Sequence, residues 1–103
     1  RAYTIRDRGN RRHRAYRIVV RTGELGQYYG IQGTTWEAPP ILDSPTRTRK
    51  SGGRSYDIYE DGGRIRIVAW RSPGGRYWVS NTLLYSLSNA QIQAIARSMS
   101  RIN

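Results

Sequence analysis

Apolar and polar residues alternate along three segments in the second half of the chain. The segments are residues 54–60, 64–71 and 76–82, and they are separated by Asp61-Gly62-Gly63 and Ser72-Pro73-Gly74-Gly75. A period of two is typical of β-strands, and glycine-rich pairs favour hairpin turns. This part of the chain is therefore predicted to form a meander of three antiparallel strands.

The alternation also predicts which side chains share a face of the meander. In the middle strand, one face is expected to carry Ile65, Ile67 and Ala69, and the other Arg64, Arg66, Val68 and Trp70. In the third strand, Tyr77 and Val79 are set against Arg76, Trp78 and Ser80. One face is expected to pack on a core and the other to be half exposed.

Three further strands are expected in the first half of the chain, where β-branched and aromatic residues cluster. They are residues 2–5, 15–21 and 27–32. Residues 6–14 contain no apolar side chain and are predicted to form a basic loop or hairpin tip. Residues 22–26 are predicted to form a tight turn.

The long connections in the middle of the chain carry proline, glycine and basic residues. Residues 33–44 include Pro39-Pro40 and are interpreted as an extended connection. Residues 45–53 are interpreted as a basic linker that ends in a flexible Ser51-Gly52-Gly53 turn.

A helix is predicted over residues 87–102. Ser88 and Gln91 have the spacing of a capping box, and Leu87 can pack onto Ile92 as a hydrophobic staple. The apolar stripe expected on one side of the helix is Ile92, Ile95, Ala96, Met99 and Ile102. A helix with one apolar side must bury it, so we expect it to lie across the sheet.

The predicted fold is a single α+β domain of residues 1–103. It consists of a small twisted antiparallel β-sheet of about five to six strands, with one C-terminal helix packed across it. Residues 1–14 are the basic N-terminal strand and loop, 15–82 the sheet and 87–102 the helix. The two free edges of such a sheet would allow dimerisation by strand pairing.

The net charge of the chain bears most directly on its function. The chain has 18 Lys+Arg against 7 Asp+Glu, a formal net charge of +11, and Lys50 is its only lysine. An excess of arginine over lysine is explained equally by selection for bidentate recognition of phosphate or carboxylate and by the codon bias of a GC-rich genome. A field this positive predicts affinity for polyanions.

The residues that catalysis needs are scarce. His13 is the only histidine, it stands in an arginine run, and no Gly-x-Ser-x-Gly nucleophile elbow is present. Glu60-Asp61 lies at a glycine hairpin, where acidic residues are common for turn formation. With no cysteine, thiolate metal sites and disulfides are excluded. We predict a protein that is not an enzyme and has no metal or cofactor.

The candidate binding residues are therefore cations and aromatic rings. The predicted cationic contacts are Arg11, Arg12, Arg14, Arg64, Arg66, Arg71 and Arg76. Trp70, Tyr77 and Trp78 are candidate stacking or sugar platforms, and flat rings beside guanidinium groups suit anionic polymers. The alternative for the two tryptophans is burial in the core under the helix.

Several short motifs together resemble a known family. They are Tyr28-Tyr29-Gly30-Ile31-Gln32-Gly33-Thr34-Thr35-Trp36, Pro39-Pro40-Ile41-Leu42, Gly52-Gly53-Arg54, the segment 61–71, Tyr77-Trp78-Val79-Ser80-Asn81-Thr82-Leu83, and the helix start from Leu87. This pattern resembles the C-terminal segment that follows the catalytic domain in some actinobacterial LytR-CpsA-Psr envelope proteins.

The resemblance implies a cellular location for the chain but assigns no catalytic residue to it. Proteins of that family transfer anionic glycopolymers from a polyprenyl pyrophosphate lipid onto peptidoglycan outside the cytoplasmic membrane, with a metal and arginines in the catalytic domain. Nothing in this chain matches that catalytic domain, so no catalytic residue carries over. The chain would be an extracytoplasmic accessory domain of the cell envelope, held there by the membrane anchor of its parent.

Two main functional hypotheses follow. The first is an accessory domain that binds anionic cell-wall polymer or the membrane surface, or docks on the parent catalytic domain. The second is a small basic nucleic-acid-binding module, favoured by charge but lacking zinc fingers, a recognition helix and an RNP-type aromatic pattern. A small phosphate- or sugar-processing enzyme is a third. The chain begins at Arg1 without a signal-like run, which favours a piece cut from a longer protein.

Overall fold

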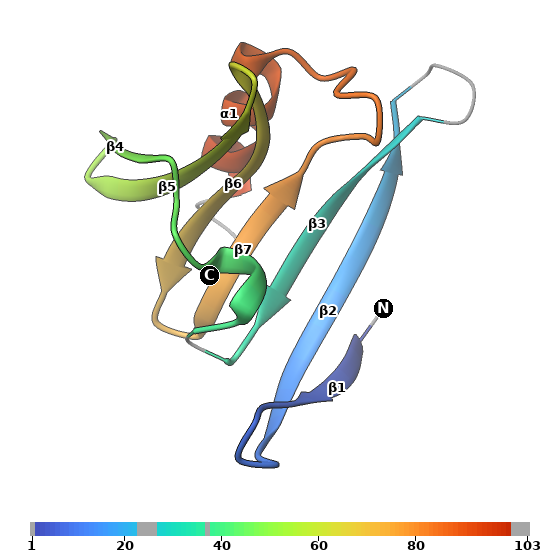
Figure 1. The fold of residues 1–103 in the computed structure, drawn as a ribbon, viewed down its shortest axis with the longest axis vertical. Helices are drawn as coiled ribbons and strands as arrows, with labels where there is room; N and C mark the ends of the chain where they lie inside the picture. Colours follow the sequence, from blue (N-terminus) through green and yellow to red (C-terminus); the bar gives the residue numbers. More distant parts are fainter. Residues whose placement is uncertain (1, 23–26, 37, 100–103) are drawn as a thin grey trace.

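The computed structural model describes residues 2–22, 27–36 and 38–99. All of its strands belong to one sheet (Figure 1). The strands are β1 (Ala2–Arg6), β2 (Arg12–Arg21), β3 (Tyr28–Thr34), β4 (Arg47–Ser51), β5 (Arg54–Asp61), β6 (Arg64–Ser72) and β7 (Gly75–Ser80). A short 3-10 helix, η1 (Pro40–Leu42), and the helix α1 (Asn89–Ser98) complete the described elements. The predicted α+β class, an antiparallel sheet with one C-terminal helix, is confirmed.

The order of the strands divides the sheet into two halves. It runs β1-β2-β3-β7-β6-β5-β4, with every neighbouring pair antiparallel. The strands β1 to β3 and the strands β4 to β7 are each consecutive along the chain, so among the described strands the ladder between the two halves is the pairing of β3 with β7. The register there runs from Gly30↔Ser80 to Thr34↔Arg76.

The seventh strand is β4, which lies in the segment predicted to be a basic linker. It pairs with β5 from Arg47↔Ile58 to Ser51↔Arg54. Gly52 and Gly53 have φ angles of 58° and 79°, the left-handed conformation that a two-residue hairpin requires. The strand shows no hydrophobic alternation because it is an edge strand whose side chains are largely exposed, so its sequence carries no strand pattern. The predicted linker was wrong for this reason.

Two other boundaries also differ from prediction. Strand β2 begins at Arg12 rather than residue 15, and β3 continues to Thr34. The extra residues carry no apolar alternation, but their backbone groups pair in the ladder. Arg12 and Arg14 are exposed, whereas Thr34 is buried and its hydroxyl donates to the Arg14 carbonyl at 2.9 Å. The predicted turn at residues 22–26 and the end of the predicted helix, residues 100–102, lie outside the described residues.

The helix α1 packs against β6 and β7 and covers one face of that half of the sheet. The capping box is confirmed: Ser88 Oγ accepts from the Gln91 N–H at 3.1 Å, and Gln91 Oε1 accepts from the Ser88 N–H at 2.8 Å. Leu87 and Ile92 belong to one buried cluster, as the staple predicts.

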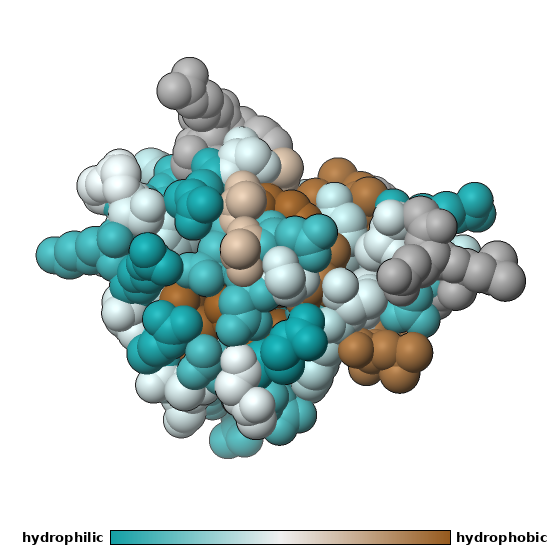
Figure 2. Space-filling model, turned by 90° about the horizontal axis from the view of Figure 1, so that it is seen from above, coloured by the Kyte–Doolittle hydropathy of each residue, from teal (hydrophilic) through white to brown (hydrophobic). Residues whose placement is uncertain are grey.

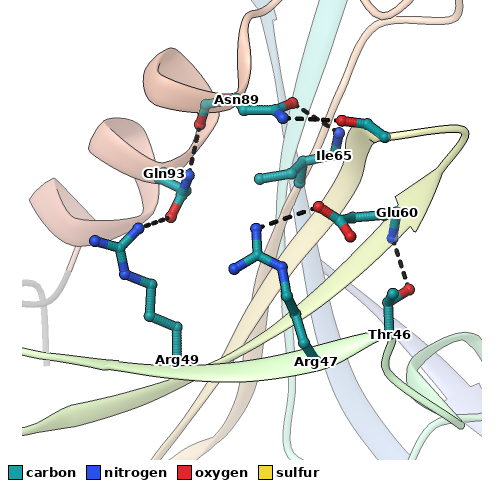
Figure 3. Close-up of polar contacts among 8 residues, drawn as sticks. Thr46, Arg47, Arg49, Glu60, Ile65, Asn89 and Gln93 are labelled. Carbon is teal, nitrogen blue, oxygen red and sulfur yellow. Dashed lines mark hydrogen bonds and ion pairs between the residues drawn. The ribbon is translucent and has the colours of Figure 1, made fainter.

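Polar side chains fix the helix and the edge strand to the sheet (Figure 3). Asn89 accepts from the Ile65 N–H at 2.9 Å and donates to the Gly63 carbonyl at 3.0 Å. Arg49 of β4 donates to Gln93 of α1 at 2.9 Å, and Arg47 pairs with Glu60 at 3.2 Å. The helix thus bonds to both β6 and β4.

A second core lies on the opposite face of the sheet. It consists of Leu42, Tyr59, Ile67, Ala69 and Trp78. The Tyr59 hydroxyl donates to the Leu42 carbonyl at 2.5 Å, which holds η1 over this face. Burial raises the pKa of Tyr59, so the hydroxyl keeps its donor proton throughout the physiological range.

The predicted assignment of faces in β6 was wrong, because both faces of this strand are buried. A bulge between Tyr59 and Glu60 shifts the register, so that Tyr59 opposes Ile67 and Glu60 opposes Ile65. Ile65 therefore joins Val68 and Trp70 in the helix-side core, while Ile67 lies in the other. A strict period of two cannot anticipate this shift.

A row of aromatic rings crosses the helix side of the sheet. The centroids of Tyr16 and Tyr77, of Tyr77 and Trp70, and of Trp70 and Tyr56 are each 6.1 Å apart. The row passes over β3 at Gly33, where a Cβ would lie 2.4 Å from Tyr16 Cε1 and 2.6 Å from Tyr77 Cδ1. The missing side chain of one glycine allows the rings of both halves to meet.

We predict that Gly33→Ala lowers the free energy of unfolding by about 1–3 kcal/mol, because the added methyl group forces Tyr16 and Tyr77 apart. Gly9→Ala is the matched control, since a Cβ there would approach only Asp7 Oδ1, at 3.4 Å. It should change stability by less than about 0.5 kcal/mol. Urea denaturation of the two variants measures both values, and equal effects would show that the rings do not depend on the gap.

Candidate functional site

The ten predicted binding residues are not brought together on one surface. Trp70, Trp78 and Arg76 are 2%, 6% and 5% exposed. Trp70 lies in the helix-side core and Trp78 in the opposite one. The alternative that both tryptophans are buried in the core is confirmed, although only Trp70 lies under the helix. The face that arginines and tryptophans would have shared does not form, and neither indole offers a stacking surface.

Arg76 holds strands together inside the sheet. Its guanidinium pairs with Asp57 of β5 at 3.2 Å, across the intervening strand β6. Thr48 of β4 donates to the other oxygen of Asp57 at 3.1 Å. The three side chains connect β7, β5 and β4, which makes Arg76 a structural residue.

Arg64 and Tyr77 also serve the fold. One nitrogen of Arg64 donates to the carbonyls of Tyr85 and Leu87, at 2.5 and 2.8 Å. These bonds hold the segment between β7 and α1 against β6. Tyr77 is half-buried in the aromatic row between Tyr16 and Trp70.

The remaining predicted contacts are exposed: Arg11, Arg12, Arg14, Arg66 and Arg71. The first three lie on the hairpin between β1 and β2. Asp7 organises its tip, because one carboxylate oxygen bonds His13 Nε2 at 2.9 Å and the other accepts from the Arg11 N–H at 2.9 Å. These bonds, the one to His13 first, lower the pKa of Asp7.

His13, the one candidate general base, takes part in the same tip structure. Its ring stacks on Trp36 with centroids 5.3 Å apart and planes 11° apart. The imidazole thus joins the hairpin to the end of β3, with Asp7 on its Nε2 atom. The neighbouring arginine side chains point to solvent along an ordered hairpin.

A hollow that was not predicted from the sequence lies on the face opposite α1, where β2, β3, β7 and β6 are neighbours. Its volume is about 370 Å³. Arg17 and Arg66 line it together with Tyr28, Gln32 and Ser80. We call these five residues the arginine hollow. They come from four strands, so only the sheet register reveals that they are neighbours.

Polar groups form the floor of the arginine hollow. Gln32 Nε2 donates to Ser80 Oγ at 3.2 Å. Gly30 leaves the space open, because a Cβ there would lie 2.9 Å from that hydroxyl. The Arg66 guanidinium carbon lies 6.0 Å from the centre of the Tyr59 ring, which orients this exposed cation. The floor offers an amide and a hydroxyl, and the walls offer guanidinium groups.

Four acidic residues of the described part of the chain have partners outside the arginine hollow. Asp7 bonds His13, Asp57 pairs with Arg76, and Glu60 pairs with Arg47. Asp61 accepts from the Tyr85 hydroxyl at 3.0 Å. The formal net charge of +11 makes the surface as a whole positive.

Within residues 2–22, 27–36 and 38–99, no three acidic, histidine or cysteine side chains gather as metal ligands. No helix in the same part of the chain is both long and apolar enough to cross a membrane. No protein-family model, curated protein or solved structure matches the chain. The function must therefore be argued from the surface itself.

Arg71 and Arg76 face each other in the β6–β7 register and provide a matched pair of substitutions. Arg76→Ala should lower the free energy of unfolding by about 1–3 kcal/mol, because it leaves the partly buried Asp57 carboxylate without its partner. Arg71→Ala removes an exposed cation and should change it by less than about 0.5 kcal/mol. Urea denaturation compares them, and an equally mild Arg76→Ala would contradict the structural role.

Proposed function

We propose that the chain is a non-catalytic domain that binds an anionic polymer through the arginine hollow and the neighbouring basic hairpin. The observation that carries the proposal is the hollow of about 370 Å³ with Arg17 and Arg66 in its walls. It lies in a chain with a formal net charge of +11. A concave site with convergent polar groups is the usual form of a ligand site.

The chemistry of the hollow fits a phosphate or carboxylate with hydroxyl groups beside it. A guanidinium group binds such anions through paired N–H donors. The amide of Gln32 and the hydroxyl of Ser80 suit the hydroxyls of a sugar unit, and the half-exposed Tyr28 ring suits its apolar face. The hairpin arginines, Arg11, Arg12 and Arg14, would add contacts to a longer polymer.

We place this activity in the cell envelope, on the strength of the resemblance to LytR-CpsA-Psr proteins. In that setting the chain is an extracytoplasmic accessory domain of a membrane-anchored glycopolymer transferase. Its ligand is the anionic wall polymer or the lipid headgroups, and its arginines can also dock on the parent catalytic domain. The chain itself is then a binding module rather than an enzyme.

Nucleic acid is the second candidate, supported by the charge and by Tyr28, which is 46% exposed beside the arginines. Proteins that bind single strands stack successive bases on several exposed rings. Because Trp70 and Trp78 are both buried in the cores, neither ring can stack on a base. The structure therefore favours the glycopolymer over the oligonucleotide.

The test is a titration at physiological salt against a teichoic-type glycopolymer, anionic liposomes and a random oligonucleotide of equal charge density. We expect the double variant Arg17→Gln, Arg66→Gln to bind the glycopolymer about tenfold more weakly than the unchanged protein. Its matched control is Arg49→Gln, Arg97→Gln, which removes the same charge from the helix side of the sheet.

The control should weaken binding by no more than about twofold, because exposed charges away from the contact act only through a screened field. Equal losses in both double variants would show that affinity follows net charge and would overturn the role of the hollow. Oligonucleotide binding about tenfold tighter than glycopolymer binding would replace this proposal with the nucleic-acid module.

A further inference from the structure

Two adjacent leucines project from the segment that connects β7 to α1. Leu83 is 97% exposed and Leu84 is 77% exposed. They occupy the tip of a turn that is closed by a hydrogen bond of 3.0 Å from the Tyr85 N–H to the Thr82 carbonyl. We call residues 82–85 the leucine turn. A single exposed leucine is ordinary, but apolar side chains that are contiguous at a surface are typical of interaction sites.

The leucine turn is firmly held at its base. Thr82 is 1% exposed, and its hydroxyl accepts from the Ser86 N–H at 2.8 Å and bonds the Ser86 hydroxyl at 2.7 Å. The Arg64 guanidinium donates to the carbonyls of Tyr85 and Leu87. These bonds fix both ends of the turn and leave its tip out of the core.

Asn81 closes the same network from the strand side. Its amide nitrogen donates to the carbonyls of Ile65 and Leu87, at 2.9 and 3.0 Å. Its oxygen accepts from the N–H groups of Thr82 and Leu87, at 2.8 and 3.1 Å. With every polar group of this side chain in use, the connection has one well-defined shape. The fold therefore holds the two leucines in a defined position at the surface.

The surroundings of the leucine turn are apolar and cationic. Leu83 lines the same hollow as Val19 and Ile41, which are 53% and 50% exposed. Arg17 and Arg66 line it too. Figure 2 looks onto this end of the molecule and shows hydrophobic side chains at the surface, one group projecting at the edge, among hydrophilic ones.

We propose that the leucine turn inserts into the interfacial region of an anionic lipid bilayer, while Arg17 and Arg66 contact the headgroups. Apolar side chains on a projecting turn, next to cations, match the two layers of such a surface: acyl chains below and negative headgroups above. A protein partner would be expected to meet a broader apolar patch with aromatic anchors. The formal charge of +11 complements anionic lipid.

This inference extends the proposed binding of anionic surfaces to one lipid contact, but it rests on the leucines and not on polymer binding. The first test is partitioning of the whole chain onto vesicles of phosphatidylcholine with phosphatidylglycerol, and onto phosphatidylcholine alone. We expect a preference for the anionic vesicles. The double variant Leu83→Gln, Leu84→Gln should bind them at least about tenfold more weakly, because its charge is unchanged and only insertion is lost.

Ile18→Gln is the control, since Ile18 is 47% exposed and, by the alternation of side chains along β2, lies on the opposite face from Arg17 and Val19 of the hollow. It should weaken partitioning by no more than about twofold. Thermal unfolding should be nearly unchanged in the leucine variant, because side chains this exposed make few contacts. Absence of vesicle binding by the unchanged protein, or equal binding by the leucine variant, would overturn the proposal.

The depth of insertion separates this proposal from adsorption by charge alone. The sequence contains no cysteine, so Leu84→Cys gives a single site for an environment-sensitive fluorophore, with Ile18→Cys as its counterpart. On anionic vesicles the label at residue 84 should shift to the blue and be quenched by lipids brominated in their acyl chains. A label that stays in water while the protein is bound would contradict insertion.

The glycopolymer titration keeps the two proposals apart. The single variant Leu84→Gln, whose side chain does not line the hollow, should retain the glycopolymer affinity of the unchanged protein and lose vesicle binding, and the Arg17, Arg66 double variant should lose the glycopolymer affinity. Failure of glycopolymer binding with intact insertion of residue 84 would remove the proposed polymer ligand and leave the lipid contact. The reverse result would remove the lipid contact alone.

Discussion

The packing of Tyr16 and Tyr77 over Gly33 is the contact on which the rest of the structure depends. The half-sheet of β1 to β3 and the half-sheet of β4 to β7 share strand pairing at β3 and β7 alone among the described strands. On one side of that junction the aromatic row passes over Gly33. On the other side, Gly30, Gln32 and Ser80 form the floor of the arginine hollow. The two glycines therefore have opposite uses: one lets rings close over the sheet, and the other keeps a space open beneath it. A shift of register by one residue would exchange these faces and destroy both features.

The two halves of the sheet are stabilised differently, and the candidate site lies where they meet. The strands β5 to β7 have a core on each face, with α1 on one side and η1 on the other. The strand β2 carries Ile18 and Val19 half exposed on opposite faces, so its half gains less from burial. It depends on the β3–β7 ladder and on the aromatic row for its position. The half-sheet of β1 to β3 therefore keeps part of its surface accessible to a ligand, while the two cores on β5 to β7 remain covered.

The sequence predicted the elements whose signals are local, and missed those that depend on register. The helix start at Ser88 and the three strands of the meander follow from short-range patterns, and the structure confirms them. The bulge opposite Glu60 has no such signal, and it moved Ile65 to the other face from Ile67. Strand β4 was missed because an edge strand needs no apolar alternation. The arginine hollow was missed because its residues are contributed by four strands, although Arg17 within an apolar run was a visible irregularity.

The arginines of this chain have several roles, and the number of them is not by itself the signature of a site. Arg64 reaches two carbonyls with one nitrogen, and Arg76 pairs with a carboxylate inside the sheet. These two arginines serve the fold, which explains part of the arginine content without any ligand. The arginines left for binding are those that the fold holds at its surface, beside a floor of polar groups or beside the leucine turn. Because Leu83 borders the same hollow as Arg17 and Arg66, lipid insertion and polymer binding would orient the domain in one way. The hollow would then open at the headgroup layer, and a polymer bound in it would lie along the surface of the membrane.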